Sequence, residues 1–373
     1  MTQKPSITSF QLLLMAAGSA LVFPYTFMPI LNAPPSNQDV WIVLILTILY
    51  SIVLDFPLLF IVNKFRGNSA NEIFEKTLGK FLGKLFVFLF LLFFLFCFCA
   101  CMLIMAIFIN LYLFPDTPTW GLLVTMLIAV SYSAYKGAGT IGRLATIFVP
   151  IIIFTIIIFF LMGIDKMDIG ILKPVLVDSK FIDLNMGAFL TAARYSEIFI
   201  FLNFSCFLKR EVSVYKTYLK SMLIFGAGFL LILLPTVLVL GVDFARIAWN
   251  PYYVYSRQVE AFGFLERMQA INTMAWFPLS LLKLTMYNFM ACRGLSGIFG
   301  LKSYKPFVIP VSAIGFIVSL LPIMNKSATV EILRSDRVFP FITLPVIFVL
   351  PLITMVVYLI RKKKINTGPG QNK

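Results

Sequence analysis

Apolar residues along the chain gather into ten long runs separated by short polar connections. Most runs approach the roughly 20 residues that an α-helix needs to cross a bilayer core at about 1.5 Å per residue. The pattern predicts an all-α integral membrane protein with about ten transmembrane helices and no soluble domain. The predicted spans are Ile7–Leu31, Val40–Asn63, Leu82–Phe114, Trp120–Tyr135, Leu144–Met162, Gly187–Phe207, Leu219–Leu240, Ala270–Cys292, Phe307–Leu321 and Val338–Ile360.

The ten predicted spans divide into two sets of five, and an odd number of spans gives the two sets opposite orientations. This inverted repeat is the arrangement of many secondary transporters, whose ligand sites lie near the bilayer midplane. We therefore expect one membrane domain over 1–373. Its first repeat covers about 7–162, its second about 187–360, and a basic cytoplasmic tail follows at 361–373.

In many such transporters the first helix of each repeat is broken near the midplane. The first span carries Gly18-Ser19-Ala20 and then Pro24 and Pro29, and the sixth carries Tyr195-Ser196-Glu197 in its middle. Small residues and prolines also occur in membrane helices for packing alone. Their corresponding positions in the two halves favour breaks in both the first and the sixth helix.

Basic residues are distributed unevenly between the two sets of connections. The connections on one side, together with both ends of the chain, hold 20 Lys and Arg residues, and those on the other side hold 9. Because Lys and Arg concentrate next to helix ends on the cytoplasmic side, both termini are predicted to be cytoplasmic. The outer connection Gly241–Gln269 combines tyrosines with arginines, which favours a short helix at the membrane interface; a ligand gate is the alternative.

The amino-acid composition mainly excludes other classes of protein. Hydrophobic residues make up 60% of the chain and charged residues 13%, so lipid must be the solvent of much of its surface. The net charge of +15 follows the topology pattern and does not indicate a nucleic-acid partner. The chain lacks histidine, the usual general base, and its five cysteines fit buried thiols better than disulfides or a metal site. With no catalytic or phosphate-binding motif, the sequence predicts neither an enzyme nor a bound cofactor or metal.

Four ionisable residues fall inside the predicted spans: Asp55, Arg194, Glu197 and Lys283. A charge at the centre of a membrane helix costs about 2.5–3.5 kcal/mol, so it should face the protein interior and find a partner. Glu197 can pair with Lys283, or with Arg194 at three-residue spacing. Either pair can be structural, or one member can hold a polar ligand. Asp55 precedes Pro57 and is expected nearer the solvated cytoplasmic interface.

Two further helix faces bear on the predicted site. Cys97, Cys101 and Met105 share a face of the third span, which favours packing against neighbouring helices over lining a pocket. Tyr287 lies one turn from Lys283, and a buried tyrosine hydroxyl needs a partner. The candidate ligand-binding residues are Gly18, Ser19, Cys101, Tyr195, Ser196, Glu197, Lys283 and Tyr287.

Several segments resemble one known family in their order and spacing. They are Gly18-Ser19-Ala20 followed by Phe23-Pro24, Ala70-Asn71-Glu72-Ile73, Leu78-Gly79-Lys80-Phe81-Leu82-Gly83-Lys84, Phe114-Pro115-Asp116-Thr117-Pro118, Phe264-Leu265-Glu266-Arg267 and Phe299-Gly300-Leu301-Lys302-Ser303-Tyr304-Lys305-Pro306. Over nearly its whole length the chain is similar to the B subunits of endospore germinant receptors, also called spore germination permeases. The family often has a glycine directly before the glutamate of the sixth span, where this chain has Ser196.

The resemblance implies a LeuT-like fold, like that of the amino acid–polyamine–organocation transporters. It also implies a germinant-sensing subunit that works with A-type and C-type subunits in the inner membrane of the spore. A cation- or proton-coupled amino-acid transporter on the same scaffold is the alternative.

The two expected breaks suggest a ligand. Helix N-termini exposed at Gly18-Ser19 and Tyr195-Ser196 would hold a carboxylate through free N–H groups, with an ammonium group placed toward Glu197. An amino acid is therefore the expected germinant. Gly18→Val is expected to fill part of its space.

Overall fold

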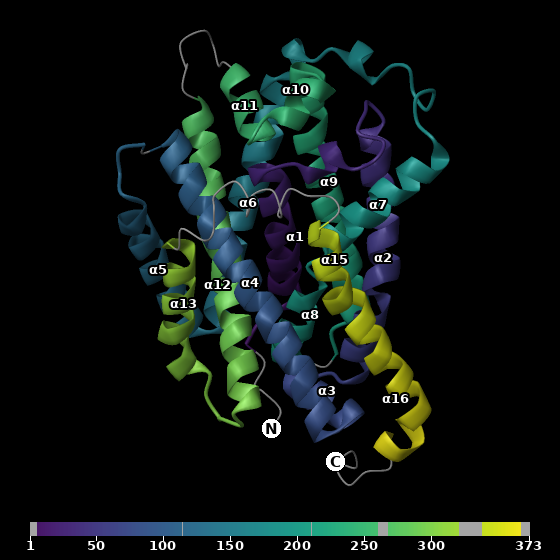
Figure 1. Ribbon diagram of the computed structural model, residues 1–373, viewed down its shortest axis with the longest axis vertical. Helices are drawn as coiled ribbons and strands as arrows, with labels where there is room; N and C mark the ends of the chain where they lie inside the picture. Colours follow the sequence, from purple (N-terminus) through teal and green to yellow (C-terminus); the bar gives the residue numbers. More distant parts are fainter. Residues whose placement is uncertain (1–5, 114, 210, 260–267, 321–337, 367–373) are drawn as a thin grey trace.

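The structure is a computed structural model that describes residues 6–113, 115–209, 211–259, 268–320 and 338–366. These residues form helices joined by turns and irregular connections, with no strand among them. The long helices stand side by side in one bundle (Figure 1). The all-α prediction is therefore confirmed for the described part of the chain.

The helices follow the apolar runs of the sequence. They are α1 (Ser9–Thr26), α2 (Val40–Lys64), α3 (Ala70–Leu78), α4 (Lys80–Tyr112), α5 (Thr119–Lys136), α6 (Ala138–Met162), α7 (Phe181–Tyr195), α8 (Ile198–Phe204), α9 (Val214–Leu240), α10 (Val242–Ile247), α11 (Pro251–Gln258), α12 (Met268–Ile298), α13 (Val308–Leu320), α15 (Val338–Leu344) and α16 (Leu350–Asn366). Short 3₁₀ turns lie at Pro29–Asn32, Ile164–Lys166, Ile169–Leu172, Ser205–Phe207 and Lys305–Phe307, and a π-helical segment at Pro345–Val349 joins α15 to α16.

Six segments among the described residues are long and apolar enough to cross a membrane: α1, α2, α4, α6, α9 and Val338–Lys362. The other four predicted spans fall on α5, the pair α7–α8, α12 and α13, which stand in the same bundle (Figure 1). Leu321, the predicted end of the ninth span, lies outside the described residues. Length and composition thus support a multi-helix membrane protein.

Large apolar side chains point outward from several helices. Exposed examples are Val53, Ile128, Phe154, Leu223 and Ile309, on α2, α5, α6, α9 and α13. Water-soluble proteins rarely expose apolar surface on this scale. The exterior of the bundle is therefore suited to lipid.

Short local signals place the turn between α3 and α4. α3 begins with a capping box, in which Ser69 Oγ accepts from the Glu72 N–H and the Glu72 carboxylate accepts from the Ser69 N–H. α3 ends at Leu78, and the φ of 92° at its C-cap Gly79 suits glycine. A Cβ at Gly83 would lie 2.7 Å from the Glu75 Cα, so this glycine lets α3 fold back against α4.

The first span differs from the prediction. α1 is a continuous helix from Ser9 to Thr26 that passes through Gly18-Ser19 and Pro24, and its extended C-cap is Phe27. The expected break at Gly18-Ser19 is therefore wrong. A Cβ at Gly18 would lie 2.5 Å from Val149 Cγ2, so the glycine lets α6 approach α1 closely.

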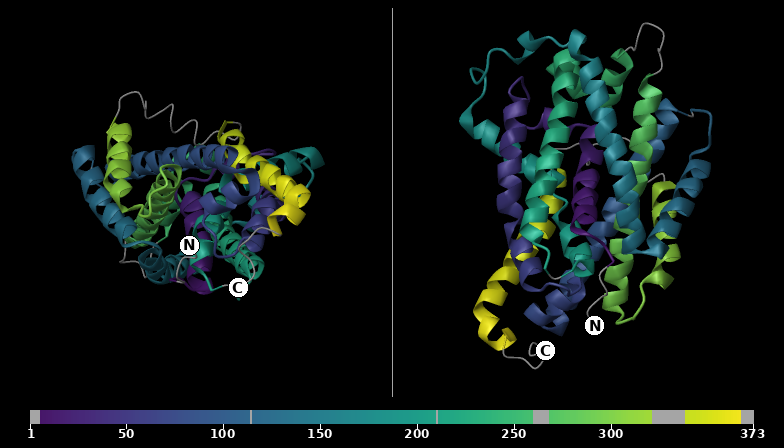
Figure 2. Two further views of the ribbon diagram at one scale, coloured as in Figure 1. Left: turned by 90° about the horizontal axis from the view of Figure 1, so that it is seen from below. Right: turned by 180° about the vertical axis from the view of Figure 1, so that it is seen from behind.

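The two ends of the bundle differ. The first turn of α1 and the last turns of α16 lie at one end, and α10 and α11 cover the other (Figures 1 and 2). The short helix expected within Gly241–Gln269 is confirmed as α10 and α11, although residues 260–267 lie outside the described part. The Asn250 side-chain amide donates to the Thr26 carbonyl at the end of α1, and the Tyr255 hydroxyl of α11 donates to the Phe159 carbonyl of α6. These two hydrogen bonds attach the α10–α11 segment to α1 and α6.

Candidate functional site

The sixth span is interrupted in its middle, as predicted. α7 ends at Tyr195, Ser196 has φ −64° and ψ 120°, and α8 begins at Ile198. Inside a membrane bundle, the backbone groups that an interruption frees need partners from the protein. Ser196 supplies one, because its Oγ accepts from the Ile198 N–H at 3.5 Å. The break therefore forms without the glycine that the family often has before this glutamate.

Glu197 lies at the centre of a buried polar cluster directly after the break. Its Oε1 is 2.6 Å from Lys283 Nζ on α12, and both side chains are 1% exposed. The Ser19 hydroxyl on α1 donates to Oε2 at 3.0 Å, and the Tyr287 hydroxyl donates to Oε1 at 3.2 Å. A buried carboxylate is stable only with a countercharge and hydrogen bonds, and Glu197 has both. The cluster ties α1, α8 and α12 together.

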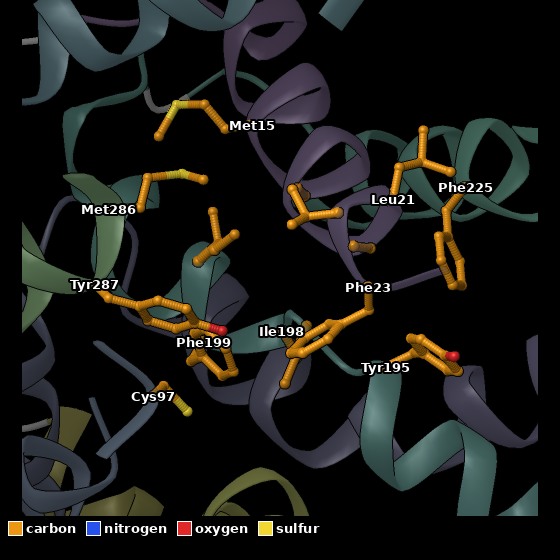
Figure 3. Close-up of a cluster of buried hydrophobic side chains, with 14 of the residues drawn as sticks. Met15, Leu21, Phe23, Cys97, Tyr195, Ile198, Phe199, Phe225, Met286 and Tyr287 are labelled. Atoms are coloured by element: carbon orange, nitrogen blue, oxygen red, sulfur yellow. The ribbon is translucent and has the colours of Figure 1, made fainter. Parts of the chain in front are cut away.

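The ammonium group of Lys283 is enclosed by three kinds of partner. Besides Glu197, it donates to the Ser19 carbonyl oxygen at 2.8 Å and lies 3.6 Å from the centroid of the Phe23 ring. A carboxylate, a carbonyl and an aromatic face each attract a cation. Figure 3 shows the rings of Phe23, Phe199 and Tyr287 gathered around this break. The space for an ammonium beside Glu197 is thus filled by the protein's own lysine.

Of the two partners that sequence allowed for Glu197, the structure has Lys283. Arg194, the local alternative, places its guanidinium 5.3 Å from the centroid of the Phe339 ring on α15. Although Arg194 and Glu197 are three residues apart, they do not share a regular helix turn, because the chain is extended between them. The i,i+3 geometry on which the local pair depends is therefore absent.

Asp55 of α2 contacts the same break in the sixth span through Ser196. Its carboxylate is fully buried and accepts from the Ser196 hydroxyl at 2.6 Å and from the Tyr218 hydroxyl of α9 at 2.7 Å. The expectation that Asp55 lies near a solvated interface is therefore wrong. The side chain faces α8 and α9 inside the bundle, away from the end of α2. Asp55 thus adds a second buried carboxylate that sequence reasoning left out of the site.

A small cavity of about 20 Å³ lies beside the ion pair, between α1, α4 and α12. This volume is enough for about one water molecule, so a larger ligand can enter only if the helices around it move apart. Among the described residues that line it, Lys283 carries the charge, and the buried Ser280 Oγ has no hydrogen-bond partner in the part of the chain that the structure describes. The remaining lining residues are Val22, Phe23, Thr26, Phe27, Cys101, Ile104, Met105 and Trp276. The cavity therefore combines an apolar wall with one polar edge on α12.

The structure brings most of the predicted site residues together. Ser19, Glu197, Lys283 and Tyr287 form the polar cluster, with Ser196 adjacent to it. Cys101 lines the cavity, although packing had been favoured for its helix face.

Two predicted residues lie elsewhere. Gly18 packs against Val149 and Leu279, which occupy the space where a side chain would be. The Tyr195 ring packs against Phe23 and Phe229, at centroid distances of 6.0 and 5.1 Å. Neither is among the residues that line the cavity.

Sequence reasoning missed most of the residues that line the cavity, among them Trp276 and Ser280. Both lie on the face of α12 that carries Lys283, at helical spacings of seven and three residues. The Trp276 indole donates to Thr26 Oγ1 at 2.8 Å, which leaves Ser280 as the polar group facing the cavity next to Lys283. Reading α12 for a polar stripe through Lys283 would have found both.

No group of three or more His, Cys, Asp or Glu side chains that could hold a metal occurs in the described part of the chain. The five cysteines are free thiols there, and four of them are buried.

Comparison with known proteins places the chain in a family. The sequence model of the family described as spore germination protein matches residues 6–328, which is most of the chain. The chain belongs to this family. Spore germination protein A2 of Bacillus subtilis (strain 168) is 24% identical over 375 residues, covering 97% of this chain and 99% of that protein. Spore germination protein YndE of the same organism is 22% identical over 352 residues, covering 94% of each.

Family membership confirms the resemblance read from the sequence. One of the segments that carried it, Phe264-Leu265-Glu266-Arg267, lies outside the described residues, as does Phe114 of another. The described parts of the others lie in α1, in α3, in the first turns of α4 and in the connections next to α5 and α13. The two relatives match over almost the full length, so the helices that build the polar cluster belong to the shared region.

Proposed function

We propose that this protein is the germinant-sensing subunit of a spore germination receptor, and that a small amino acid binds at the cavity between α1, α4 and α12, which widens to admit it. The observation that carries the proposal is the placement of Lys283, which joins the cavity to the broken sixth span. A ligand in the cavity touches a residue that holds α1, α8 and α12 together. Binding can therefore change how those helices are connected.

The orientation of the ligand follows from the charges already in place. The ammonium position beside Glu197 is taken by Lys283, so the ammonium of an amino acid does not bind there in this arrangement. α8 has seven residues, and its Ile198 N–H is taken by Ser196 Oγ. We infer that the carboxylate of the ligand lies against Lys283 and Ser280, and that its side chain faces Phe23, Ile104 and Met105.

Signalling requires that the ligand bind two conformations of the receptor with different affinities. A carboxylate that approaches Lys283 competes with Glu197 for the same ammonium group. Weakening that ion pair loosens the hold of α12 on α8, because Lys283 is the charged partner of Glu197. The ligand thus favours a conformation in which α8 is displaced, and A-type and C-type partner subunits would read that change.

The ten-helix inverted repeat, the inner membrane of the spore and cytoplasmic termini complete the proposal. The excess of Lys and Arg on one side supports the orientation. Cysteines introduced next to Lys76 and Lys216 are expected to be protected from an impermeant thiol reagent in intact cells, and one next to Asn37 is expected to react. Labelling next to Lys76 would reverse the orientation.

The binding proposal is tested in spores that carry single variants of the gene. Ser280→Ala removes one donor from the cavity, so the germinant concentration for half-maximal response should rise roughly two- to twelvefold, as expected for about 0.5–1.5 kcal/mol. Thr285→Ala is the matched control, because the buried Thr285 hydroxyl donates to its own helix at Leu281. The measurement is loss of spore optical density against germinant concentration, with immunoblotting of the receptor. Equal responses of both variants would remove the ligand from this cavity.

A cation- or proton-coupled amino-acid transporter is the second candidate. The broken sixth span with a buried ion pair favours it, because such breaks carry substrate sites in many transporters. Uptake of a labelled amino acid into proteoliposomes that contain this chain alone is the deciding measurement. Uptake that Ser280→Ala reduces would support transport, and ligand binding without uptake would support the sensing subunit.

A further inference from the structure

Among the described residues, Asp55 is a buried carboxylate without a cationic partner. Its exposed fraction is 0%, and its two hydrogen bonds come from the neutral hydroxyls of Ser196 and Tyr218. Within the described part of the chain, no Lys or Arg nitrogen lies within 4.0 Å of it. Glu197, by contrast, has Lys283 at 2.6 Å. The two carboxylates on either side of the break are therefore held in different ways.

The described elements packed against α2 bring no positive charge to Asp55. From α9 it meets Tyr218, while Lys216 and Lys220 of that helix are exposed. From the break it meets Ser196, with the negative Glu197 next in the chain. On α7 Arg194 lies over Phe339, and on α16 Arg361 donates to the Thr77 carbonyl. Tyr358 of α16 packs against Phe60, further along α2, and against Phe65, just after its end.

A lone ionised carboxylate in such surroundings is expensive, and the cost is removed when the group takes up a proton. Both neighbours suit either form of the group, because a hydroxyl both donates and accepts. Protonation also removes the repulsion from the nearby carboxylate of Glu197.

We propose that Asp55 is a proton-binding site, and that Ser196 links its occupancy to the Glu197–Lys283 ion pair. Ser196 is the shared element, because its Oγ contacts Asp55 at 2.6 Å and its backbone forms the break that leads into Glu197. A displacement of α8 that moves Ser196 changes the surroundings of Asp55, and so changes its affinity for the proton. Linkage is reciprocal, so the proton in turn favours one position of α8.

This inference goes beyond ligand sensing and does not depend on it. Asp55 is not among the residues that line the cavity, and the contacts that define the proton site hold whatever ligand occupies the cavity. Failure of the binding test with Ser280→Ala would leave the proton site untouched. Failure of the proton test would leave the cavity untouched.

Infrared spectroscopy of the purified full chain in lipid nanodiscs tests the site directly. A protonated carboxyl gives a C=O stretching band separate from the bands of carboxylates and amides, and the band shifts in D₂O. Wild type near neutral pH should show this band, and Asp55→Asn should lose it. Glu197→Gln is the matched comparison, and its band should remain because Asp55 is intact. Absence of the band in wild type, or its loss in Glu197→Gln and persistence in Asp55→Asn, would overturn the proposal.

Separate experiments test the link through Ser196 and the identity of the bound ion. Ser196→Ala removes the hydrogen bond to Asp55, so the pH midpoint of the band should shift, whereas Thr285→Ala should leave it unchanged. The shift that Glu197→Gln causes should also differ between the wild-type chain and a chain that already carries Ser196→Ala. Additive shifts would overturn the link. Loss of the wild-type band on addition of Na⁺ would overturn the proton site in favour of a metal-cation site.

Discussion

The first and the sixth spans carry corresponding sequence signals but have different structures. The first has Gly18-Ser19 and Pro24, residues that weaken a helix, and yet α1 is continuous. The sixth has neither glycine nor proline at its centre, and yet the chain is extended at Ser196. The signals that are strongest by helix propensity therefore do not mark the break.

What differs is how the central residues of each span meet their neighbours. At the sixth span, Ser196 bonds to Asp55 and Glu197 to Lys283, both across to other helices. At the first span, Ser19 also bonds to Glu197 and Lys283, but from a continuous helix, and Gly18 faces Val149 and Leu279, which offer close packing and no polar partner. Polar partners across the bundle therefore do not by themselves open a helix, and a small residue such as Gly18 gives room for a neighbour.

The largest expected effect comes from removing the charge that supports the break. Lys283→Met leaves the Glu197 carboxylate buried without its cation, which should cost about 3–5 kcal/mol of stability. Thermal unfolding of the purified protein in detergent, with the membrane abundance of the variant, measures the loss.

The double variant Glu197→Gln/Lys283→Met removes both charges and should recover much of the loss seen in Lys283→Met. Strictly additive losses would show that the ion pair does not support the break, and the comparison of the two spans would fail.

The next effect tests the packing explanation for the first span. Gly18→Val adds a side chain where Val149 and Leu279 already lie, so we expect a loss of about 1–3 kcal/mol from overpacking. Lower membrane abundance should accompany any change in the germination response. Val149→Ala in the same chain should restore part of the abundance. A shifted dose response at full abundance would instead return Gly18 to the ligand site.

The smallest effect concerns the residue at the break itself. Ser196→Gly keeps the backbone free to be extended but removes the hydroxyl that bonds to Asp55, which should cost about 0.5–1.5 kcal/mol. The variant moves toward the family pattern and should accumulate normally. Its stability and dose response are measured beside those of Gly18→Val. A loss as large as that of Lys283→Met would mean that the serine, and not the ion pair, holds the break open.

The helical class and most element positions followed from the sequence, because the period and length of the apolar runs are local properties. The break at Tyr195-Ser196 was predicted from the polar residues in the middle of the sixth span and their correspondence with the first span, and the structure has it. The break at Gly18-Ser19 was predicted from small residues and prolines, which is weaker evidence for an interrupted helix. A glycine in a membrane helix can signal close approach as well as interruption, and the approaching Val149 lies far away in the sequence.

The burial of Glu197 and Lys283 and their need for a partner can be inferred from the sequence alone, because both lie inside apolar spans. The folded bundle is needed to see that they compensate each other rather than through Arg194, that Ser280 and Trp276 share a cavity with Lys283, and that Asp55 faces inward. Partner choice depends on which helix faces meet. That choice is fixed by close packing at positions such as Gly18, between residues that no local pattern connects.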